Sequence, residues 1–447
     1  MTRRDDTIAA VATPPGAGGV GVLRVSGPLA RAICRNLTGK QPPPRQVCFS
    51  AFSDAEEVPL DRGLCIYFKA PASFTGEDVL ELHAHGSPVV LDLLLKRVCA
   101  LGARPARPGE FSERAFLNGK LDLIQAEAVA DLIASGSEAA ARAALRSLEG
   151  AFSEQVNEIF DALVRLRAWL EGALDFPEDE IDFLGEPQLK DDLAALRTRT
   201  GRLLAATRSG AVLRDGLHVV IVGRPNAGKS SLLNALAQSE RAIVTAVPGT
   251  TRDVLRESVL LDGIGLTLVD TAGLHASEDE VEREGIRRAR DELLRADVAI
   301  LVTQSSHADE DATLLNSCTA GVIRLIVHNK IDLSGETAHV ERDGDAARIY
   351  LSARTGDGLA GLRAELSRLA MPGDATQGAF SARTRHVQAL EIVLQHLEAA
   401  TTQLAESAGE LVAEELRLAQ QSLGEITGVY SSEDLLGAIF STFCIGK

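Results

Sequence analysis

The sequence has few aromatic residues and few cysteines, and it has no long apolar run. Aromatic residues make up 4% of its 447 residues, and its six cysteines lie scattered without a CxxC pair. We therefore expect reduced thiols rather than a disulfide framework or a zinc site. No apolar run approaches the roughly 20 residues that span a membrane, and the charged N-terminal residues lack the apolar core of a signal peptide. These absences predict a cytoplasmic protein that does not enter the membrane.

The sequence also has fewer basic than acidic residues. The 46 Lys and Arg residues face 63 Asp and Glu residues, which gives a formal net charge of −17. This balance argues against a generally basic nucleic-acid-binding protein, so a nucleic acid would have to meet a local patch or be held by another subunit. One modestly basic stretch contains Arg97, Arg104, Arg107, Arg114 and Lys120. From sequence alone, we interpret this stretch as a solvated surface.

The N-terminal part of the chain mixes strand and helix signals. Residues 1–118 contain strand-like segments at 7–12, 20–25 and 79–85, and an amphipathic helical pattern at 88–100. We expect an α+β domain here. His83 and His85 lie on one face of a predicted strand. The two histidines could bind a metal ion together, but the sequence offers no evident third ligand. Two histidines on a polar strand face are therefore the preferred interpretation.

The rest of the chain changes character twice. Residues 119–214 and 373–447 are rich in Ala, Leu, Glu and Arg at helical spacing, whereas residues 215–372 alternate strand and helix patterns. This order predicts a parallel α/β module inserted into a discontinuous helical domain, since insertion is tolerated where chain ends lie close together.

The chain is organised around residues 223–231, GRPNAGKSS, which match the phosphate-binding pattern GxxxxGK[ST]. An apolar run at 217–222 predicts a buried strand before the loop, and a helix opening follows at 231–237. Strand, glycine loop and helix together direct backbone N–H groups and a helix N-terminus at an anion. Lys229 is expected to reach the β- and γ-phosphates, and the Ser230 hydroxyl to bind Mg²⁺.

Two motifs downstream suit the γ-phosphate side of such a site. Thr251, in the loop sequence GTTRD, is our choice for completing Mg²⁺ coordination in a loop that orders with the triphosphate. An apolar strand then leads into DTAG, which places Asp270 at the ligand-binding edge of the sheet. Asp270 is expected to hold Mg²⁺ through water, and the Gly273 N–H to meet the γ-phosphate.

Two further motifs suit the base. The sequence NKID follows an apolar strand and ends at Asp332. A carboxylate there accepts from the guanine N1–H and N2 amine, an arrangement that adenine lacks, so the motif specifies GTP over ATP. The sequence SAR then brings Ala353 near the base. The ordered motifs predict a GTPase.

The residue that would position the attacking water is unconventional. In Ras-like enzymes a glutamine follows DxxG, but here the position is Leu274, which cannot orient a water molecule. Carboxylates of the acidic segment 278–284 are the next candidates. Spacing does not choose among them, and a plain acidic helix start is a fair alternative.

Taken together, these features resemble the MnmE (TrmE) family of GTPases, which modify the wobble uridine of certain tRNAs. The resemblance covers essentially the whole chain and includes five short segments: TPPG at 13–16, SFTGED at 73–78, RPGEFS at 107–112, DFPE at 175–178 and FCIGK at 443–447. It implies an N-terminal folate-binding and dimerisation domain, a discontinuous helical domain and an inserted Ras-like G domain.

The resemblance also implies residue roles. Glu282 matches the family's catalytic glutamate, which acts on the attacking water through a second water. Asn226 matches a ligand of a K⁺ ion that replaces an arginine finger, and the other K⁺ ligands are expected from Thr245, Val247 and Thr250. Pro248 and His275 depart from the family's usual residues. The matching positions for folate are Arg24, Glu81, Lys120 and Lys447. Cys444 is interpreted as a thiol lining the folate pocket rather than as a nucleophile.

The full set of residues expected to bind GTP is Asn226, Ala227, Gly228, Lys229, Ser230, Ser231, Thr245, Ala246, Val247, Pro248, Gly249, Thr250, Thr251, Asp270, Thr271, Ala272, Gly273, Asn329, Lys330, Asp332, Ser352, Ala353 and Arg354. The implied cofactors are GTP, Mg²⁺, K⁺ and 5-formyl- or 5,10-methylene-tetrahydrofolate. The implied partners are a second copy of the chain, the FAD-binding subunit MnmG and tRNA, and the implied product is a uridine carrying an aminomethyl-type group at C5. The alternatives are a ribosome-assembly GTPase, for which a basic RNA-binding appendix is lacking, and a non-catalytic GTP switch.

Overall fold

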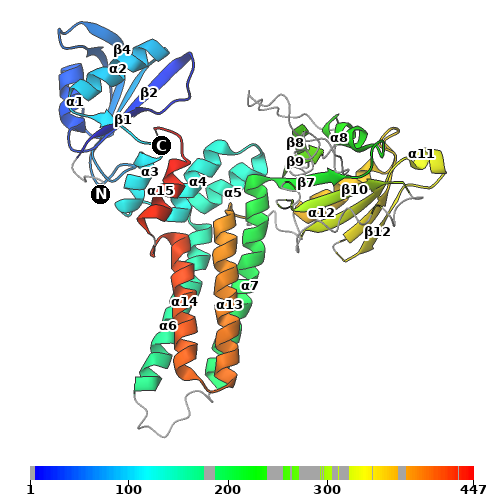
Figure 1. Cartoon of the computed structure of the whole chain (residues 1–447). Coiled ribbons are helices and arrows are strands. Elements are labelled where there is room, and N and C mark those ends of the chain that lie inside the picture. The colour runs from blue at the N-terminus through cyan, green and yellow to red at the C-terminus, as the bar shows by residue number, and fades with distance from the viewer. Residues whose placement is uncertain are drawn as a thin grey trace, which may run out of the picture. The chain divides into compact units, whose positions relative to one another are not determined.

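The computed structural model describes residues 6–175, 187–238, 255–261, 264–270, 292, 294, 296–304, 311, 322–344, 346–370, 379–430 and 432–446. The chain divides into two compact units (Figure 1). One unit holds Met1–Ala130, Leu148–Arg197 and Ile392–Lys447, and the other holds Asp131–Ser147 and Thr198–Glu391. The predicted fold class, an α+β N-terminal domain with a helical domain and a P-loop α/β domain, is confirmed.

The N-terminal sheet has the strand order β3-β4-β5-β2-β1-β6. Its strands are β1 (Ile8–Val11), β2 (Gly18–Ser26), β3 (Val47–Ser53), β4 (Pro59–Phe68), β5 (Val79–Gly86) and β6 (Arg104–Pro105). Helices α1 (Ala30–Thr38) and α2 (Pro88–Ala100) pack on one face, with Leu23, Ile33 and Leu94 fully buried between helices and sheet. Because side chains alternate along a strand, Arg24 of β2 and Glu81 of β5 lie on the opposite face, directly paired in register.

The same unit contains a helical part. Its helices are α3 (Glu110–Leu117), α6 (Ala151–Asp175), α14 (Gly409–Thr427) and α15 (Glu433–Ser441), together with parts of α4 (Leu123–Ala134), α7 (Pro187–Asp215) and α13 (Thr384–Ala405). Helices α6 and α14 lie side by side over most of their length (Figure 1). Phe440 and Phe443 of the C-terminal segment pack with Leu123. The last part of the chain is therefore built into the core of this unit.

The second unit contains a seven-stranded sheet in the order β12-β13-β11-β10-β7-β9-β8. Its strands are β7 (Leu217–Val222), β8 (Leu255–Leu261), β9 (Ile264–Asp270), β10 (Val298–Thr303), β11 (Ile323–His328), β12 (His339–Asp343) and β13 (Ala346–Tyr350). The five inner strands are parallel, and β8 and β12 pair antiparallel at the edges. Every residue of β10, sequence VAILVT, is buried, as expected for a strand covered on both faces.

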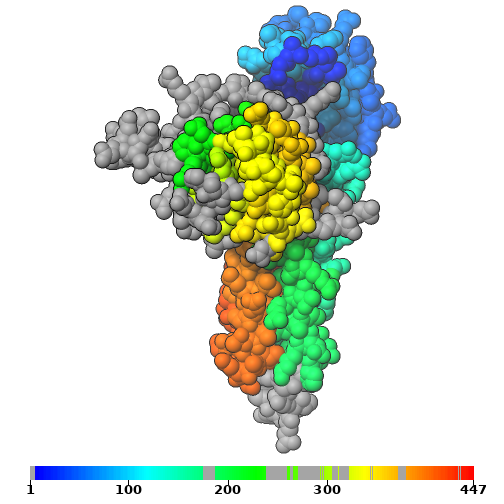
Figure 2. Space-filling model, turned by 90° about the vertical axis from the view of Figure 1, so that its right-hand side faces the viewer, coloured from blue at the N-terminus to red at the C-terminus, as the bar shows by residue number. Residues whose placement is uncertain are grey.

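Among the residues that the structure describes, this unit contains α5 (Glu138–Leu148, nearly all within it), α8 (Lys229–Gln238), α11 (Ile331–Ser334) and α12 (Leu359–Ala370), together with the remaining parts of α4, α7 and α13. Leu232 of α8 and Leu362 of α12 pack into the same core as Val219 of the central strand. The elements from β11 to α12, drawn in yellow, form one continuous surface (Figure 2). In the part of the chain that the structure describes, no helix is both long and apolar enough to cross a membrane.

Candidate functional site

The glycine loop between β7 and α8 has the backbone that the motif requires. Gly223 has φ +151°, and a Cβ there would come within 2.3 Å of the Val302 carbonyl oxygen. Gly228 has φ +100°, and a Cβ there would lie 2.2 Å from the Asn329 amide nitrogen. Both positions therefore need glycine. The Lys229 ammonium donates to the carbonyl oxygens of Gly223 (2.9 Å) and Arg224 (3.1 Å), which holds its charge over the loop.

Asn329 joins the phosphate loop to the base side of the site. Its amide nitrogen donates to the Ala227 carbonyl at 2.9 Å, and its Oδ1 accepts from the N–H groups of Lys330 (2.8 Å) and Ala353 (3.0 Å). The side chain is buried, so these bonds are shielded from water. One buried amide thus fixes three loops relative to one another.

The neighbouring charged groups are also held in place. Lys330 has φ +66° and donates from Nζ to the Asn226 carbonyl at 2.7 Å. Asp332 accepts from the Ser352 hydroxyl at 2.7 Å, and the Arg354 guanidinium lies 4.0 Å from its other oxygen. With 18% of its side chain exposed, the Asp332 carboxylate is oriented and still accessible to two adjacent N–H donors.

The carboxyl ends of the parallel strands bring these loops together. Asp270 ends β9 directly beside Ile221 of β7, and His328 ends β11 beside Tyr350 of β13. In an open parallel sheet this edge is where ligands bind. The chemistry that the loops offer is a cationic phosphate cradle next to an acceptor for a base with adjacent N1–H and amine donors.

Several predicted residues lie outside the described part of the chain. These are Thr245, Ala246, Val247, Pro248, Gly249, Thr250, Thr251, Thr271, Ala272, Gly273, Glu282 and Lys447, together with the side chain of Asp270. Ser230 and Ser231 open α8 and are exposed. Their placement at the start of the helix suits a hydroxyl ligand for Mg²⁺.

The predicted folate residues Arg24 and Glu81 form an ion pair on the face of the first sheet opposite α1 and α2. The Arg24 Nε and Nη2 atoms lie 3.0 and 2.9 Å from Glu81 Oε1. The guanidinium carbon also lies over the rings of Phe74 and Phe111, at 5.7 and 5.8 Å from their centroids. Carboxylate, cation and exposed aromatic ring are the groups that a flat, polar heterocycle with an acidic tail requires.

The loop that carries Lys120 reaches the same region. Asn118 donates to the Thr75 carbonyl at 2.7 Å, and a Cβ on Gly76 would lie 3.3 Å from the Lys120 side chain. The segments SFTGED and the loop before α4 are therefore neighbours. Phe74 and Phe111 were not among the predicted site residues. From sequence alone, a phenylalanine among polar and apolar residues is equally consistent with a place in the hydrophobic core.

The C-terminal tail docks on the same unit. The Gly109 N–H donates to the Cys444 carbonyl at 3.4 Å, and a Cβ on Gly446 would come within 2.5 Å of the Val11 carbonyl. Residues 443–446 of the tail thus lie against the RPGEFS segment and the end of β1. Cys444 itself is exposed.

The basic stretch is only partly a solvated surface. Arg107 and Lys120 are exposed, but Arg114 is buried and binds Asp6, Glu77 and Glu110. The prediction is wrong for Arg114. Arg104 keeps 37% of its side chain exposed, although it also pairs with the fully buried Glu110. Burial would raise the pKa of Glu110, but the Arg104 hydrogen bonds and the nearby arginine charges hold it down at about 2. These arginines stabilise the fold rather than bind an external anion.

The two histidines of β5 interact with carboxylates. His85 contacts Asp61 at 2.8 Å, and His83 lies 3.5 Å from Glu81. Within the described ranges, no cluster of three or more metal-ligating side chains is present. The preferred interpretation, two polar-face histidines, fits these contacts.

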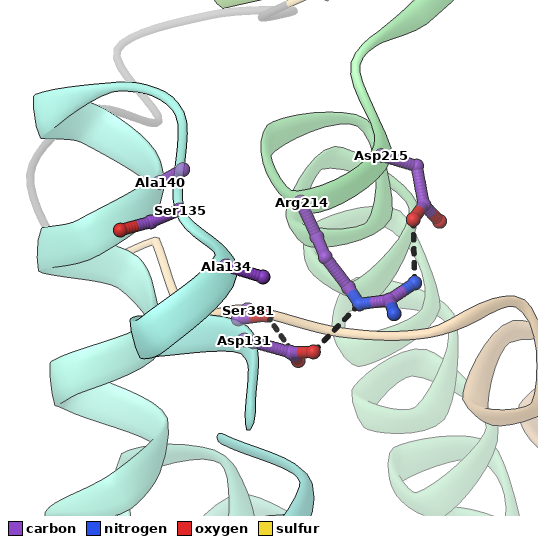
Figure 3. Close-up of a pocket in the computed structure, with 7 residues that line it drawn as sticks. All are labelled: Asp131, Ala134, Ser135, Ala140, Arg214, Asp215 and Ser381. Carbon is purple, nitrogen blue, oxygen red and sulfur yellow. Dashed lines mark hydrogen bonds and ion pairs between the residues drawn. The ribbon is translucent and has the colours of Figure 1, made fainter. Parts of the chain in front are cut away.

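A polar pocket of about 250 Å³ lies where the chain enters and leaves the second sheet (Figure 3). At its centre Asp131 accepts from Arg214 Nε (2.8 Å), Arg383 Nη2 (2.8 Å) and the Ser381 hydroxyl (3.0 Å). Arg214 precedes β7, and Ser381 and Arg383 precede α13. The Asp131 carboxylate therefore links the chain segment that enters the second sheet, and the segment that leaves it, to α4. Burial raises the pKa of Asp215, which also lines the pocket.

Comparisons with known proteins show which family the chain belongs to. The family model "MnmE helical domain" matches residues 123–444, and the model "GTP-binding protein TrmE N-terminus" matches residues 7–120. The tRNA modification GTPase MnmE of Stutzerimonas stutzeri (strain A1501) is 54% identical over 451 residues, covering 99% of each chain. The chain belongs to the MnmE family. The MnmE of Azoarcus sp. (strain BH72) is also 54% identical, over 100% of this chain and 99% of that one.

Among solved structures, the G domain of the T. maritima FeoB iron transporter is similar at 25% identity, with a TM-score of 0.27, over 35% of this chain and 99% of that domain. As a member of the MnmE family, the chain is a GTP hydrolase.

Proposed function

We propose that this chain is a K⁺-activated GTPase that works with an FAD-binding MnmG-type subunit on tRNA. Together they add an aminomethyl-type group to C5 of the wobble uridine, with a one-carbon unit from 5-formyl- or 5,10-methylene-tetrahydrofolate. The observation that carries the nucleotide part is Asn329, whose buried amide joins the phosphate loop to the two base-recognition loops. The relatives' name, tRNA modification GTPase, supports the substrate. Action on tRNA also favours a cytoplasmic location.

In this proposal the described residues bind and orient the nucleotide. Lys229 exchanges its carbonyl partners for the β- and γ-phosphates, while Asp332, oriented by Ser352, accepts from the guanine N1–H and N2 amine. The N–H of Ala353, already aligned by Asn329, lies beside the base. Affinity for guanine therefore depends on side chains that other side chains already hold in place.

The phosphate loop can also hold cations. Ser230, with Thr251, would bind Mg²⁺, and Asp270 would hold it through water. Asn226 has φ +62° and an exposed side chain, and no described residue donates to its Oδ1, so this carbonyl oxygen is available to a K⁺ ion. Thr245, Val247 and Thr250 are the other proposed ligands. Bound K⁺ supplies positive charge where negative charge develops between the phosphates.

Water activation is assigned to Glu282, acting through a second water. Leu274 follows DTAG and offers no polar atom. A carboxylate from the following acidic segment therefore takes over the orienting role that glutamine has in Ras-like enzymes.

The folate part of the proposal rests on the Arg24–Glu81 pair. Glu81 would accept from pterin N–H groups while Phe74 packs on the ring. Lys120 and Lys447 would bind the acidic tail. The site lies in the domain that the family resemblance assigns to homodimer formation. Glu81→Gln is expected to weaken binding of either tetrahydrofolate derivative, measured by calorimetry, without changing GTP turnover.

GTP turnover measured in KCl and in NaCl at equal ionic strength tests the mechanism. The wild type should turn over faster in KCl, and Asn226→Ala should lose that difference. Glu282→Gln should lose turnover but keep GDP affinity, whereas Glu284→Gln, a carboxylate of the same segment, should behave like the wild type. Equal wild-type rates in the two salts, or full activity of Glu282→Gln, would contradict the proposal.

A further inference from the structure

Three aromatic rings stack across the edge strands of the second sheet. The Tyr350 ring on β13 lies between His328 of β11 and His339 of β12, with both histidines in direct register with it. The centroid separations are 4.4 Å to His328 and 4.1 Å to His339, and the ring planes differ by only 10° and 8°. The three rings form one nearly parallel column.

The column stands at the base of both guanine-recognition loops. His328 immediately precedes Asn329, and Tyr350 immediately precedes the segment that holds Ser352 and Ala353. Beside the rings, the Leu351 N–H donates to the His328 carbonyl at 3.0 Å. The two loops then meet through the Asn329–Ala353 and Asp332–Ser352 hydrogen bonds. Any slip between β11 and β13 would therefore shift both of these bonds.

Histidine at position 328 is unfavourable for the stability of the fold. The side chain is 5% exposed, and its Nδ1 has no hydrogen-bond partner among the described residues. A buried polar atom without a partner destabilises the fold, and an aliphatic residue would avoid that cost. Burial lowers the pKa of His328, which disfavours the charged form of the ring. What the position gains from histidine is a flat ring that stacks on Tyr350.

We propose that the ring stack of His328, Tyr350 and His339 is a positioning element that keeps the two guanine-recognition loops in register and so sets selectivity for guanine. This inference rests on the proposed binding of guanine nucleotides by the same loops. None of the three rings is assigned a contact with the base. They act through Asn329, Asp332 and Ala353.

Binding of GDP and of inosine diphosphate, which lacks the N2 amine, tests the proposal on the full chain. Tyr350→Leu should raise the Kd for GDP by about three- to ten-fold, the equivalent of one lost aromatic stack. The Kd for inosine diphosphate should rise less, so the ratio of the Kd for inosine diphosphate to the Kd for GDP should fall. In turnover, KM for GTP should rise while kcat stays unchanged. Tyr350→Phe retains the ring and should restore wild-type values.

Arg342→Ala is the matched control, because Arg342 lies three residues after His339 on β12 and contacts Glu365 at 2.9 Å instead of the rings. It should lower the melting temperature without changing the ratio of the two Kd values. If Tyr350→Leu keeps the wild-type ratio, or if Arg342→Ala changes it equally, the stack has no positioning role. If the wild type itself fails to prefer GDP over inosine diphosphate, the guanine site and this inference both fail.

Discussion

Substituting Asp332 by asparagine should change the preferred base from guanine to xanthine. The carboxylate is oriented by Ser352, and 18% of the side chain is exposed. A hydrogen bond to a charged group contributes about 1.5–3 kcal/mol, and guanine offers this carboxylate two donors. Partial exposure reduces each contribution, so Asp332→Asn should lose about 3 kcal/mol, which raises the Kd for GDP about a hundred-fold.

Xanthine carries a carbonyl oxygen where guanine has its N2 amine. The amide nitrogen of Asn at position 332 can donate to that oxygen, whereas the wild-type carboxylate repels it. Competition against a fluorescent guanine nucleotide measures both affinities. Asp357→Asn, a neighbouring carboxylate that binds Thr355 at 2.8 Å, is the control and should bind GDP like the wild type. If Asp332→Asn keeps wild-type affinity for GDP, or gains none for xanthosine diphosphate, the base assignment is wrong.

Three further changes test other parts of the structure. Gly228→Ala should abolish binding of GDP, because its Cβ would come within 2.2 Å of the Asn329 side-chain amide nitrogen, whereas Gly437→Ala in α15 meets nothing within 4 Å and should bind normally. Asp131→Ala should lower the free energy of unfolding by about 3 kcal/mol, since it leaves two arginines without their buried anion; Arg208→Ala, which breaks an exposed pair, should change it little. Glu110, whose pKa falls from 4.5 to about 2 on folding, contributes stability that is present above pH 4.5 and lost as pH falls toward 2. Glu110→Gln should therefore unfold more easily at pH 7 and lose less stability on acidification.

Each of these predictions has a clear contrary result. Wild-type GDP affinity in Gly228→Ala would show that the loop tolerates a side chain there. Equal thermal unfolding of Asp131→Ala and Arg208→Ala would show that the Asp131 ion pairs contribute no more than a surface pair. An unchanged acid transition in Glu110→Gln would mean that other carboxylates control it.

The sequence predicted some elements closely. The helix expected at 88–100 is α2, because Pro88 marks its first turn and its apolar residues recur at helical spacing. The strand expected at 217–222 is β7. The β3–β4 hairpin was not predicted. Phe49 of β3 is 62% exposed while Phe52 is fully buried, so apolar residues occupy both faces and blur the alternation of period two.

Contacts between residues far apart in the chain could not be predicted from local sequence patterns. The glycine loop and the motifs ending at Asp332 and Ala353 are local signals, and the structure brings them to one edge of the sheet. Asp131 differs, because its partners Arg214 and Ser381 lie 83 and 250 residues away. Nothing in the local sequence distinguishes it from an ordinary surface aspartate on an alanine-rich helix.

Mass spectrometry of tRNA nucleosides from a strain that lacks this gene tests the central claim most directly. The C5-modified wobble uridine should disappear on deletion. It should return when the wild-type gene is supplied and stay absent when the gene carries Gly228→Ala, while Gly437→Ala should restore it. Normal levels of the modified nucleoside in the deletion strain would contradict the proposed function.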